Sequence, residues 1–552
     1  MTSAVAPGRA TEGLRLRPDP GLRALRGGTI LLGGSPLRML RLGPEGTRHV
    51  AGWWHGAPVA AAPGAQALAR RLLWTGIAQP VPAGGPGPGD VTVVIPVRDR
   101  TAELALCLAG LSEYRVVVVD DGSRDPAAVT AAATAAGAQV VRRAVSGGPA
   151  AARNTGLAAV DTPLVAFLDS DCVPAPGWLD PLLPHFADPA VAAAAPRIVP
   201  YSPGGAVDGA AAGWLARYEG VSSTLDMGQV PSIVRPGSKV PYVPGAALLV
   251  RVAVAGAKDA GGFAEHLPVG EDVDFVWRLA DRGWHVRYEP AAAVAHQHRV
   301  RLASWFSRRM EYGTSAAPLE LRHPGTLPAV AMSGWSATAW AAAALGYPLA
   351  GAGIIAAATG LLARRLAPLT GAGAWPAATR LAAGGTVAAG RLLGSTLSRA
   401  WWPVALPAAV AVPRLRLPLA ALILAPPVLG WRERRPPMDP VRYVSARLLD
   451  DVAYSLGVWQ GCVRHRTARP LLPHLTWLTG PASPVHPASP VHPASPVHPA
   501  GSVHPPGAPG GARAPGPRRL ARAGAAIYGR AWRAARRSRP ARAGPGSPPD
   551  HR

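Results

Sequence analysis

Cysteine and charged residues are both scarce in this chain of 552 residues. Its three cysteines, Cys107, Cys172 and Cys462, lie at wide and irregular spacing, so neither a disulfide framework nor a zinc site is expected. Charged residues make up 16% and apolar residues 48% of the chain, a mixture that suits a globular centre, membrane-compatible segments and poorly ordered linkers. Because single hydrophobic cores stop growing near roughly 250–300 residues, more than one folded unit is expected.

A leader segment and nucleic-acid motifs are also missing. Residues 1–26 lack a seven-residue apolar run, so no signal peptide is expected and the catalytic part is expected in the cytoplasm. The net charge is +25, but residues 513–552 hold eleven Arg against one Asp, which places ten of these charges in the tail. No helix-turn-helix, zinc-finger or RNP pattern accompanies the positive charge, so the sequence favours an anionic membrane surface or a nucleotide substrate over nucleic acid.

Composition divides the chain into five regions. Residues 1–20 are rich in Pro, Gly and Arg and are expected to be flexible, and residues 21–81 read as a small α+β domain. Strands and helices alternate in residues 90–322, whereas residues 324–470 are apolar and helical. Residues 480–552 contain an Ala-Ser-Pro-Val-His-Pro repeat and the Arg-rich tail, whose proline content predicts an extended, disordered spacer.

The alternating region predicts an α/β domain. The expected strands are 91–95, 115–119, 139–142 and 164–168, and the expected helices are 102–111, 126–136 and 149–160. Continuous apolar strands between helices indicate a mostly parallel sheet that is buried on both faces. The catalytic groups should then lie at the carboxyl ends of the strands.

Two of these apolar strands run directly into acidic residues. Asp120 and Asp121 can accept hydrogen bonds from a ribose hydroxyl or a base N–H, although such a pair also occurs in simple turns. Asp169 and Asp171 are so close that their repulsion costs free energy unless a cation lies between them. Mg²⁺ or Mn²⁺ suits such oxygen ligands and would neutralise charge on a departing nucleotide.

A third acidic group and a glycine-rich turn complete the set. Glu271 and Asp272 precede a helical stretch, where the helix dipole alone can explain them; alternatively, one of them removes the proton from an acceptor hydroxyl. Residues 146–149 form a Gly-rich turn into a helix, whose N–H groups and Arg153 can face a phosphate. A P-loop Lys and a G-x-G-x-x-G pattern are absent, which argues against kinases and dinucleotide enzymes.

The apolar C-terminal region leaves its relation to a membrane open. Residues 324–363 contain no charged residue and are followed by Arg364 and Arg365, and residues 401–412 and 417–431 form another apolar pair. These stretches are long enough for one tilted transmembrane helix or for shorter ones. The alternative is an Ala-rich soluble helical extension.

The order of these motifs resembles family 2 glycosyltransferases with the GT-A fold, a Rossmann-like catalytic domain. The matching order is strand-Pro, Asp-Asp-Gly-Ser, Gly-Gly-x-Ala-x-x-Arg-Asn, Asp-x-Asp and Glu-Asp. The resemblance implies an inverting single displacement from a nucleotide-diphosphate sugar. By motif, the resemblance implies that the nucleotide sugar is bound by Pro96, Asp120, Asp121, Arg153 and Asp169. It implies that the metal is bound by Asp169 and Asp171 and that Gly245 belongs to the acceptor loop. The base would be Asp272, with Glu271 as the second candidate. His296 and His298 are read either as a further metal or diphosphate contact or as exposed loop bystanders, the latter being favoured.

More narrowly, the chain is similar to the mycofactocin-system glycosyltransferases of actinobacteria. Three features carry this similarity: the catalytic motifs, residues 271–279, and the N-terminal unit, which is similar to PqqD-like peptide-binding domains. This implies transfer of β-linked hexoses, glucose from UDP-glucose, to the peptide-derived redox cofactor mycofactocin or its precursor, at the cytoplasmic face of the cell membrane. The alternative is a processive membrane polysaccharide synthase, although residues 305–312 lack the Gln-x-x-Arg-Trp motif of such enzymes. A catalytically inactive peptide-binding scaffold is disfavoured because the acidic positions are intact.

Overall fold

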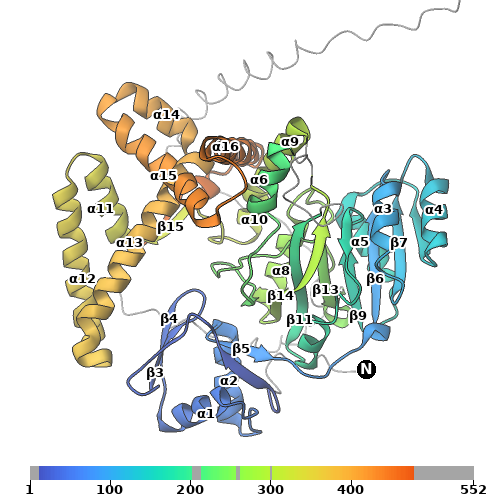
Figure 1. Cartoon of the computed structure of the whole chain (residues 1–552), viewed down its shortest axis with the longest axis horizontal. Helices are drawn as coiled ribbons and strands as arrows, with labels where there is room; N and C mark the ends of the chain where they lie inside the picture. The colour runs from blue at the N-terminus through green and yellow to red at the C-terminus, as the bar shows by residue number, and fades with distance from the viewer. Residues whose placement is uncertain (1–10, 202–212, 257–260, 299–300, 478–552) are drawn as a thin grey trace, which may run out of the picture. The chain divides into compact units, whose positions relative to one another are not determined.

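Apolar runs that end in polar residues form the strands of one large sheet. The computed structural model describes residues 11–201, 213–256, 261–298 and 301–477 (Figure 1). Four parallel neighbours form one half of the sheet in the order β8-β7-β6-β9. Their bounds are β6 (Val91–Val97), β7 (Arg115–Asp121), β8 (Gln139–Arg143) and β9 (Leu164–Leu168).

The other half of the sheet is mixed. Strand β13 runs antiparallel to both β9 and β11, and β14 lies parallel to β11. The short strands β10 and β12 pair antiparallel with β14. The bounds are β10 (Cys172–Pro174), β11 (Val191–Pro200), β12 (Ser232–Ile233), β13 (Ala247–Arg251) and β14 (His285–His296). The expected α/β fold is therefore present: the neighbours β8, β7, β6 and β9 are all parallel, and β11 with β14 forms a second parallel pair within the mixed half.

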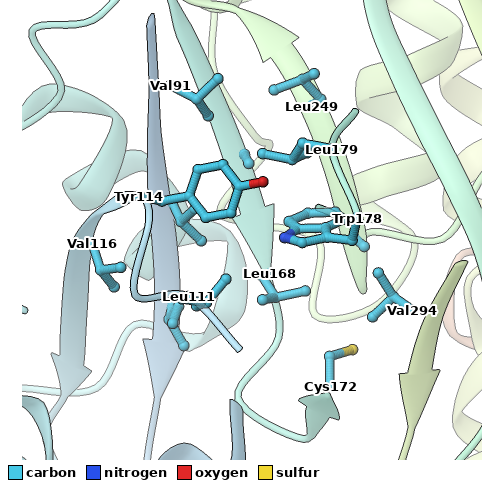
Figure 2. Close-up of a cluster of buried hydrophobic side chains, with 14 of the residues drawn as sticks. Val91, Leu111, Tyr114, Val116, Leu168, Cys172, Trp178, Leu179, Leu249 and Val294 are labelled. Carbon is cyan, nitrogen blue, oxygen red and sulfur yellow. The ribbon is translucent and has the colours of Figure 1, made fainter. Parts of the chain in front are cut away.

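Both faces of the sheet are buried. Val93 and Ile95 of β6 belong to one apolar cluster, whereas Val94 between them belongs to the cluster on the opposite face, as the alternation of a strand requires. Figure 2 shows the first cluster, in which Tyr114 and Trp178 pack beside the strands. Helices pack along the strands at α3 (Thr101–Leu108), α4 (Pro126–Ala135), α5 (Gly148–Ala158), α7 (Val252–Ala255) and α8 (Glu271–Asp281).

The N-terminal unit is a small α+β fold with its own apolar core. Its elements are β1 (Arg15–Pro18), β2 (Arg23–Leu25), β3 (Ile30–Gly33), β4 (Arg38–Arg41), α1 (Pro44–Trp54), α2 (Pro63–Thr75) and β5 (Ala78–Val81). Strand β1 pairs antiparallel with β5, so the expectation of a flexible segment is wrong for residues 15–18. Helix α1 was not expected from the sequence.

Polar and aromatic contacts fasten this unit to the catalytic region. Arg70 of α2 donates to Asp188 at 2.7 Å. Trp74 lies between the His285 ring, at 5.5 Å between centroids, and the Arg235 guanidinium, 5.2 Å from its ring. A unit of this size buries little surface by itself, and docking on a neighbour gives it the packing that it needs.

The C-terminal region is helical, as its composition predicts. Helix α6 (Trp214–Ser222) precedes this region in the sequence and packs against α16. Strands β15 (Val330–Ser333) and β16 (Pro473–Thr476) form a parallel pair. The helices are α9 (Leu302–Thr314), α10 (Ala316–Arg322), α11 (Gly334–Ala344), α12 (Pro348–Thr370), α13 (Ala374–Arg399), α14 (Trp402–Ala411), α15 (Arg416–Arg434) and α16 (Pro440–Arg464). Gly313 of α9 and Gly457 of α16 face each other so closely that a Cβ on either would collide with the opposite backbone. This contact lets α9 and α16 pack closely against each other.

Two helical segments of this region, 348–399 and 413–434, reach mean hydropathies of 1.3 and 1.2 and are long enough to cross a membrane by length and composition. Only 22% and 6% of their most apolar windows are buried by the rest of the chain. The expected disordered region 480–552 lies outside the described residues.

Candidate functional site

A cavity of about 490 Å³ lies where β9, the loop before β13 and the start of α8 meet. Its lining includes seven of the residues that the sequence singles out: Arg153, Asp169, Asp171, Gly245, Glu271, Asp272 and His296. A second cavity of about 220 Å³ adjoins it and shares Asp171. Pro96, Asp120 and Asp121 line neither cavity.

The two acids that follow β9 face the cavity. The Asp169 side chain is 32% exposed and accepts a hydrogen bond from Arg153 at 2.6 Å. The Asp171 carboxylate lies 3.3 Å from His296 Nε2 and also accepts from Arg100. Burial raises the pKa of Asp171, but hydrogen bonds and charge from His296 and Arg100 outweigh it and hold that pKa below its usual range. Asp171 is therefore ionised under ordinary conditions.

His296 and His298 are placed differently from the favoured expectation. His296 is the last residue of β14, and both side chains are largely buried, so the expectation of exposed loop histidines is wrong. Within the described part of the chain, His296 Nδ1 is buried without a hydrogen-bond partner. Burial lowers the pKa of His298 to about 3, which keeps this ring neutral. In the sequence, the His-x-His pattern at the end of a strand was the feature that could indicate that these two histidines belong to the site.

Arg153 joins two acids inside the site. The side chain is 3% exposed, and its two terminal nitrogens donate to Asp169 at 2.6 Å and to Glu271 at 2.7 Å. Burial opposes its charge, but Asp169 and Glu271 more than compensate and raise the pKa of Arg153. Arg153 thus links the end of β9 to the start of α8, while its contact with a phosphate stays a prediction.

Gly245 has no room for a side chain. Its amide donates to Asp272 Oδ2 at 2.6 Å, and its carbonyl accepts from Arg153 at 3.3 Å. A Cβ at this position would lie 3.0 Å from Asp272 Cβ and 3.2 Å from an Arg153 terminal nitrogen. The loop predicted to contact the acceptor therefore orients both of these functional side chains.

Asp272 is the more accessible of the two candidate bases. Each of its carboxylate oxygens accepts one backbone hydrogen bond, from Val273 and from Gly245, so lone pairs remain on both. Glu271 is buried and paired with Arg153. Burial and the neighbouring Asp272 charge raise the pKa of Glu271, while Arg153 lowers it. Position favours Asp272 for contact with a substrate hydroxyl.

The Asp120-Asp121 pair lies at the end of β7, away from the cavity. Asp120 accepts from the Ser123 amide at 2.9 Å and from Arg142. Asp121 accepts four hydrogen bonds, two on each oxygen, from Arg143, Ser146, Gly147 and Gly148 at 2.7–3.0 Å. Four acceptor positions are then filled, so Asp121 holds the glycine-rich turn and has no free lone pair for a nucleotide.

Pro96 lies near the carboxyl end of β6. It pairs with Val119 of β7, while the pairing of β6 with β9 stops at Val94 and Phe167. Because β6 has no partner on the β9 side at this point, the missing N–H of proline is tolerated. Pro96 is half-buried.

Helices beyond the motifs supply one wall of the cavity, and sequence reasoning missed them. Helices α9, α13 and α16 contribute the side chains of Arg308, Arg309, Tyr312, Arg399, Asp450 and Tyr454 to the lining. The Arg399 guanidinium lies 4.4 Å from the Tyr454 ring, and that of Arg308 lies 5.2 Å from the Tyr312 ring. No motif in the sequence marks these positions.

A buried charge network holds this wall in place. Arg309 of α9 pairs with Glu219 of α6 and lies 3.0 Å from Asp450 of α16. Asp450 also accepts from the Tyr218 hydroxyl at 2.9 Å. Three helices from separate parts of the sequence are thereby joined beside the cavity.

Comparisons with known proteins show which sequences this chain is similar to. Residues 92–231 match the sequence model for glycosyl transferase family 2, and residues 164–412 match that for glycosyl transferase family group 2. A pre-mycofactocin glycosyltransferase of Mycobacterium tuberculosis is 41% identical over 480 residues, which cover 85% of this chain and 99% of that protein. The glycosyltransferase AglE of Haloferax volcanii is 29% identical over 38% of this chain and 67% of its own length.

Solved structures resemble the chain more distantly. A mannosyltransferase of Pyrobaculum calidifontis, in complex with GDP-Man and Mn²⁺, has 17% identity and a TM-score of 0.36, covering 67% of this chain and 89% of its own.

Proposed function

This chain belongs to glycosyl transferase family 2, and from that premise we propose that it transfers a hexose from a nucleotide-diphosphate donor to mycofactocin or its peptide-derived precursor. The donor is UDP-glucose, the displacement inverts the anomeric centre, and repeated transfer builds a β-linked oligosaccharide. The acceptor assignment is supported by the 41% identity over 99% of the length of the mycobacterial relative, whose name specifies pre-mycofactocin.

One structural observation carries the reaction class: Asp169, Asp171 and Asp272 line a single cavity, although about 100 residues separate the first two from the third. An acidic pair for a cation and a separate carboxylate with free lone pairs are the two groups that glycosyl transfer from a diphosphate donor requires. The Arg153 and Gly245 contacts fix their relative positions.

Asp169, Asp171 and His296 fit a divalent cation. The two carboxylates are the oxygen donors that Mg²⁺ and Mn²⁺ prefer. His296 lies beside them, with Nε2 3.3 Å from Asp171 and Nδ1 buried without a partner among the described residues. No group of three or more His, Cys, Asp or Glu side chains is already gathered for a metal in the described ranges. This suits an ion that takes further oxygen ligands from the diphosphate. When bound, the ion would neutralise charge on the leaving group.

Asp272 acts as the base in this proposal. A hydroxyl of the acceptor enters the cavity beside Asp272, which takes its proton as the oxygen attacks the anomeric carbon. The bond from that carbon to the diphosphate breaks in the same step, and the nucleoside diphosphate leaves with the bonding electrons. The Gly245 amide keeps the carboxylate oriented toward the cavity. Arg153 holds Glu271 and Asp169 and so positions the site without contacting the reacting atoms.

A donor panel tests the assignment. Purified protein is incubated with Mn²⁺, a mycofactocin precursor and one of several UDP- or GDP-sugars, and the product mass is measured. If the proposal is right, hexoses are added to the precursor only when UDP-glucose is the donor. A long polysaccharide product with no modified precursor would instead favour the processive synthase. The apolar C-terminal helices are also compatible with such an enzyme.

The N-terminal unit, residues 11–81, is proposed to recognise the peptide part of the acceptor. Its small α+β fold with a separate apolar core supports this reading, because the resemblance to PqqD-like domains implies a small α+β unit. Deletion of residues 1–80 should raise the KM for the acceptor at least tenfold and leave donor hydrolysis unchanged. Retained hydrolysis shows that the catalytic domain still folds; an unchanged acceptor KM would contradict peptide recognition.

We also propose that the enzyme works at the cytoplasmic face of the cell membrane. The support is the length and hydropathy of residues 348–399 and 413–434, together with their low burial. Fractionation of cells into membrane and soluble parts tests this location.

A further inference from the structure

Exposed apolar side chains concentrate in one segment of the described chain. Of twenty-six large apolar side chains that are exposed, thirteen lie between Leu345 and Val428. Leu349, Leu406, Val410 and Leu417 are 87%, 60%, 67% and 83% exposed. Single exposed apolar residues need no explanation, but such a density marks a surface that something else covers.

The charges of this segment have one sign. Between Glu320 and Glu433 the sequence contains nine arginines and no Asp or Glu. Arg364, Arg380 and Arg414 are exposed, whereas Arg391 pairs with Glu433 at 2.7 Å. An apolar surface that carries several arginines and, at its C-terminal end, the single carboxylate of Glu433 is complementary to acyl chains beneath anionic headgroups, since long cationic side chains extend toward phosphates.

The charge-free stretches within these helices are shorter than the hydrocarbon core of a bilayer. The charge-free part of α12, residues 348–363, is about 24 Å long and that of α15, residues 417–431, is about 22 Å long at 1.5 Å per residue, less than the roughly 30 Å of a hydrocarbon core. In α13 only ten residues separate Arg380 from Arg391. Spanning would therefore place an arginine in the bilayer interior, which is costly.

The turn between α12 and α13 has a partner on the soluble side. Met39 of the N-terminal unit packs against an apolar cluster from both helices: Ala363, Leu366, Ala374 and Ala378. Both sides of this contact belong to the same compact unit as the catalytic domain. A turn held there cannot lie on the far side of a membrane.

We propose that helices α12 to α15, residues 348–434, form a monotopic surface that binds anionic phospholipid in one leaflet and does not cross the bilayer. The inference rests on the membrane association proposed above and specifies its lipid and its topology. The apolar side chains enter the leaflet, and the arginines remain at the level of the phosphates.

Flotation of the full-length chain with vesicles tests the surface. Wild-type protein should float with vesicles of phosphatidylcholine containing 30 mol% phosphatidylglycerol and at least tenfold less with pure phosphatidylcholine. The double variant Leu406→Asp/Val410→Asp should bind the anionic vesicles at least tenfold less than wild type. The control Leu106→Asp, at an exposed apolar residue of α3, should bind like wild type. Equal flotation of all three proteins would overturn the proposed surface.

Topology needs a second measurement. The three native cysteines are buried, so a single exposed cysteine can be labelled selectively with a membrane-impermeant maleimide. Ala372→Cys, in the turn after α12, and Leu37→Cys, in the N-terminal unit, should both be labelled from the cytoplasmic side. Labelling of residue 372 only from the opposite side would overturn the monotopic arrangement and leave membrane association standing. Sugar transfer to a soluble acceptor by the same proteins reports on the enzymatic proposal independently.

Discussion

The carboxyl ends of β7 and β9 have nearly the same sequence pattern but opposite structural environments. In both, an apolar strand runs into two acids. Asp121 at the end of β7 is 6% exposed and accepts four hydrogen bonds, whereas Asp169 and Asp171 after β9 are 32% and 18% exposed and line the cavity. The difference shows that the neighbours of a carboxylate, more than its place at a strand end, decide whether it can serve chemistry.

The start of α8 repeats the contrast within one turn of helix. Asp272 keeps free lone pairs beside the cavity, but Asp274 is completely buried and bound by Arg278, Arg322 and His323. We refer to Asp171 and Asp272 as open acids and to Asp121 and Asp274 as closed acids. Open acids should matter for rate and closed acids for stability.

Asp171→Ala should give the largest effect. Removing a metal ligand forfeits several kcal/mol of leaving-group stabilisation, so kcat should fall about 10³-fold. Initial rates at increasing Mn²⁺ concentration measure this loss, and the melting temperature should remain within about 3 °C of wild type because the side chain is partly exposed. Transfer at the wild-type rate without added metal would contradict the metal assignment.

Asp272→Asn should reduce kcat by about 10²–10³-fold, the usual contribution of a general base. The amide preserves the shape of the side chain, so the KM for the donor and the affinity for Mn²⁺ should stay unchanged. Asp274→Asn is the matched closed-acid variant on the same helix. If it lowered kcat as strongly as Asp272→Asn while the melting temperature was retained, the distinction between open and closed acids would fail.

Asp121→Asn should act mainly on stability. The change removes the buried negative charge that pairs with Arg143, and it places the amide NH₂ of the new asparagine against groups that themselves donate, such as the Gly147 amide. We expect the free energy of unfolding to fall by about 3 kcal/mol. Thermal unfolding should begin about 6–12 °C lower. Asp161→Asn is the control, because its ion pair with Arg115 is 3.4 Å long and exposed, and its loss should cost less than about 1 kcal/mol.

Sequence patterns located the acids because local rules govern them. An apolar run such as 164–168 must be a buried strand, and polar residues that follow it must emerge at the sheet edge. The expected strands of the parallel half and the helices between them were found within a few residues of their predicted bounds. Helix α2 of the N-terminal unit follows a local rule as well, because its buried residues recur with a helical period.

The state of each acid required long-range information. Asp121 is closed by Gly147 and Gly148, about 26 residues further along the chain, and Asp171 meets His296 after another 125 residues. The cavity wall from Arg399 and Tyr454 depends on how α13 and α16 pack, which no local period encodes. Propensity and pattern cannot specify these pairings, because they arise from the fold of the whole unit.

The pair of Asp274 with His323 should give the smallest effect, a dependence of stability on pH. Burial alone would lower the pKa of His323, but hydrogen bonds and charge from Asp274 and Asp281 outweigh it and raise that pKa to about 9. A histidine whose pKa is raised on folding stabilises the protein fully below its ordinary value near 6.5, and this contribution disappears as the pH rises through 9. Urea unfolding at pH 6.5 and pH 9.5 should therefore differ by about 1–2 kcal/mol, with the higher pH less stable. In His323→Gln the same interval should show a smaller decrease, because the glutamine cannot lose a proton; a decrease as large as in wild type would assign the pH dependence to other groups and leave Asp274 closed by its arginines alone.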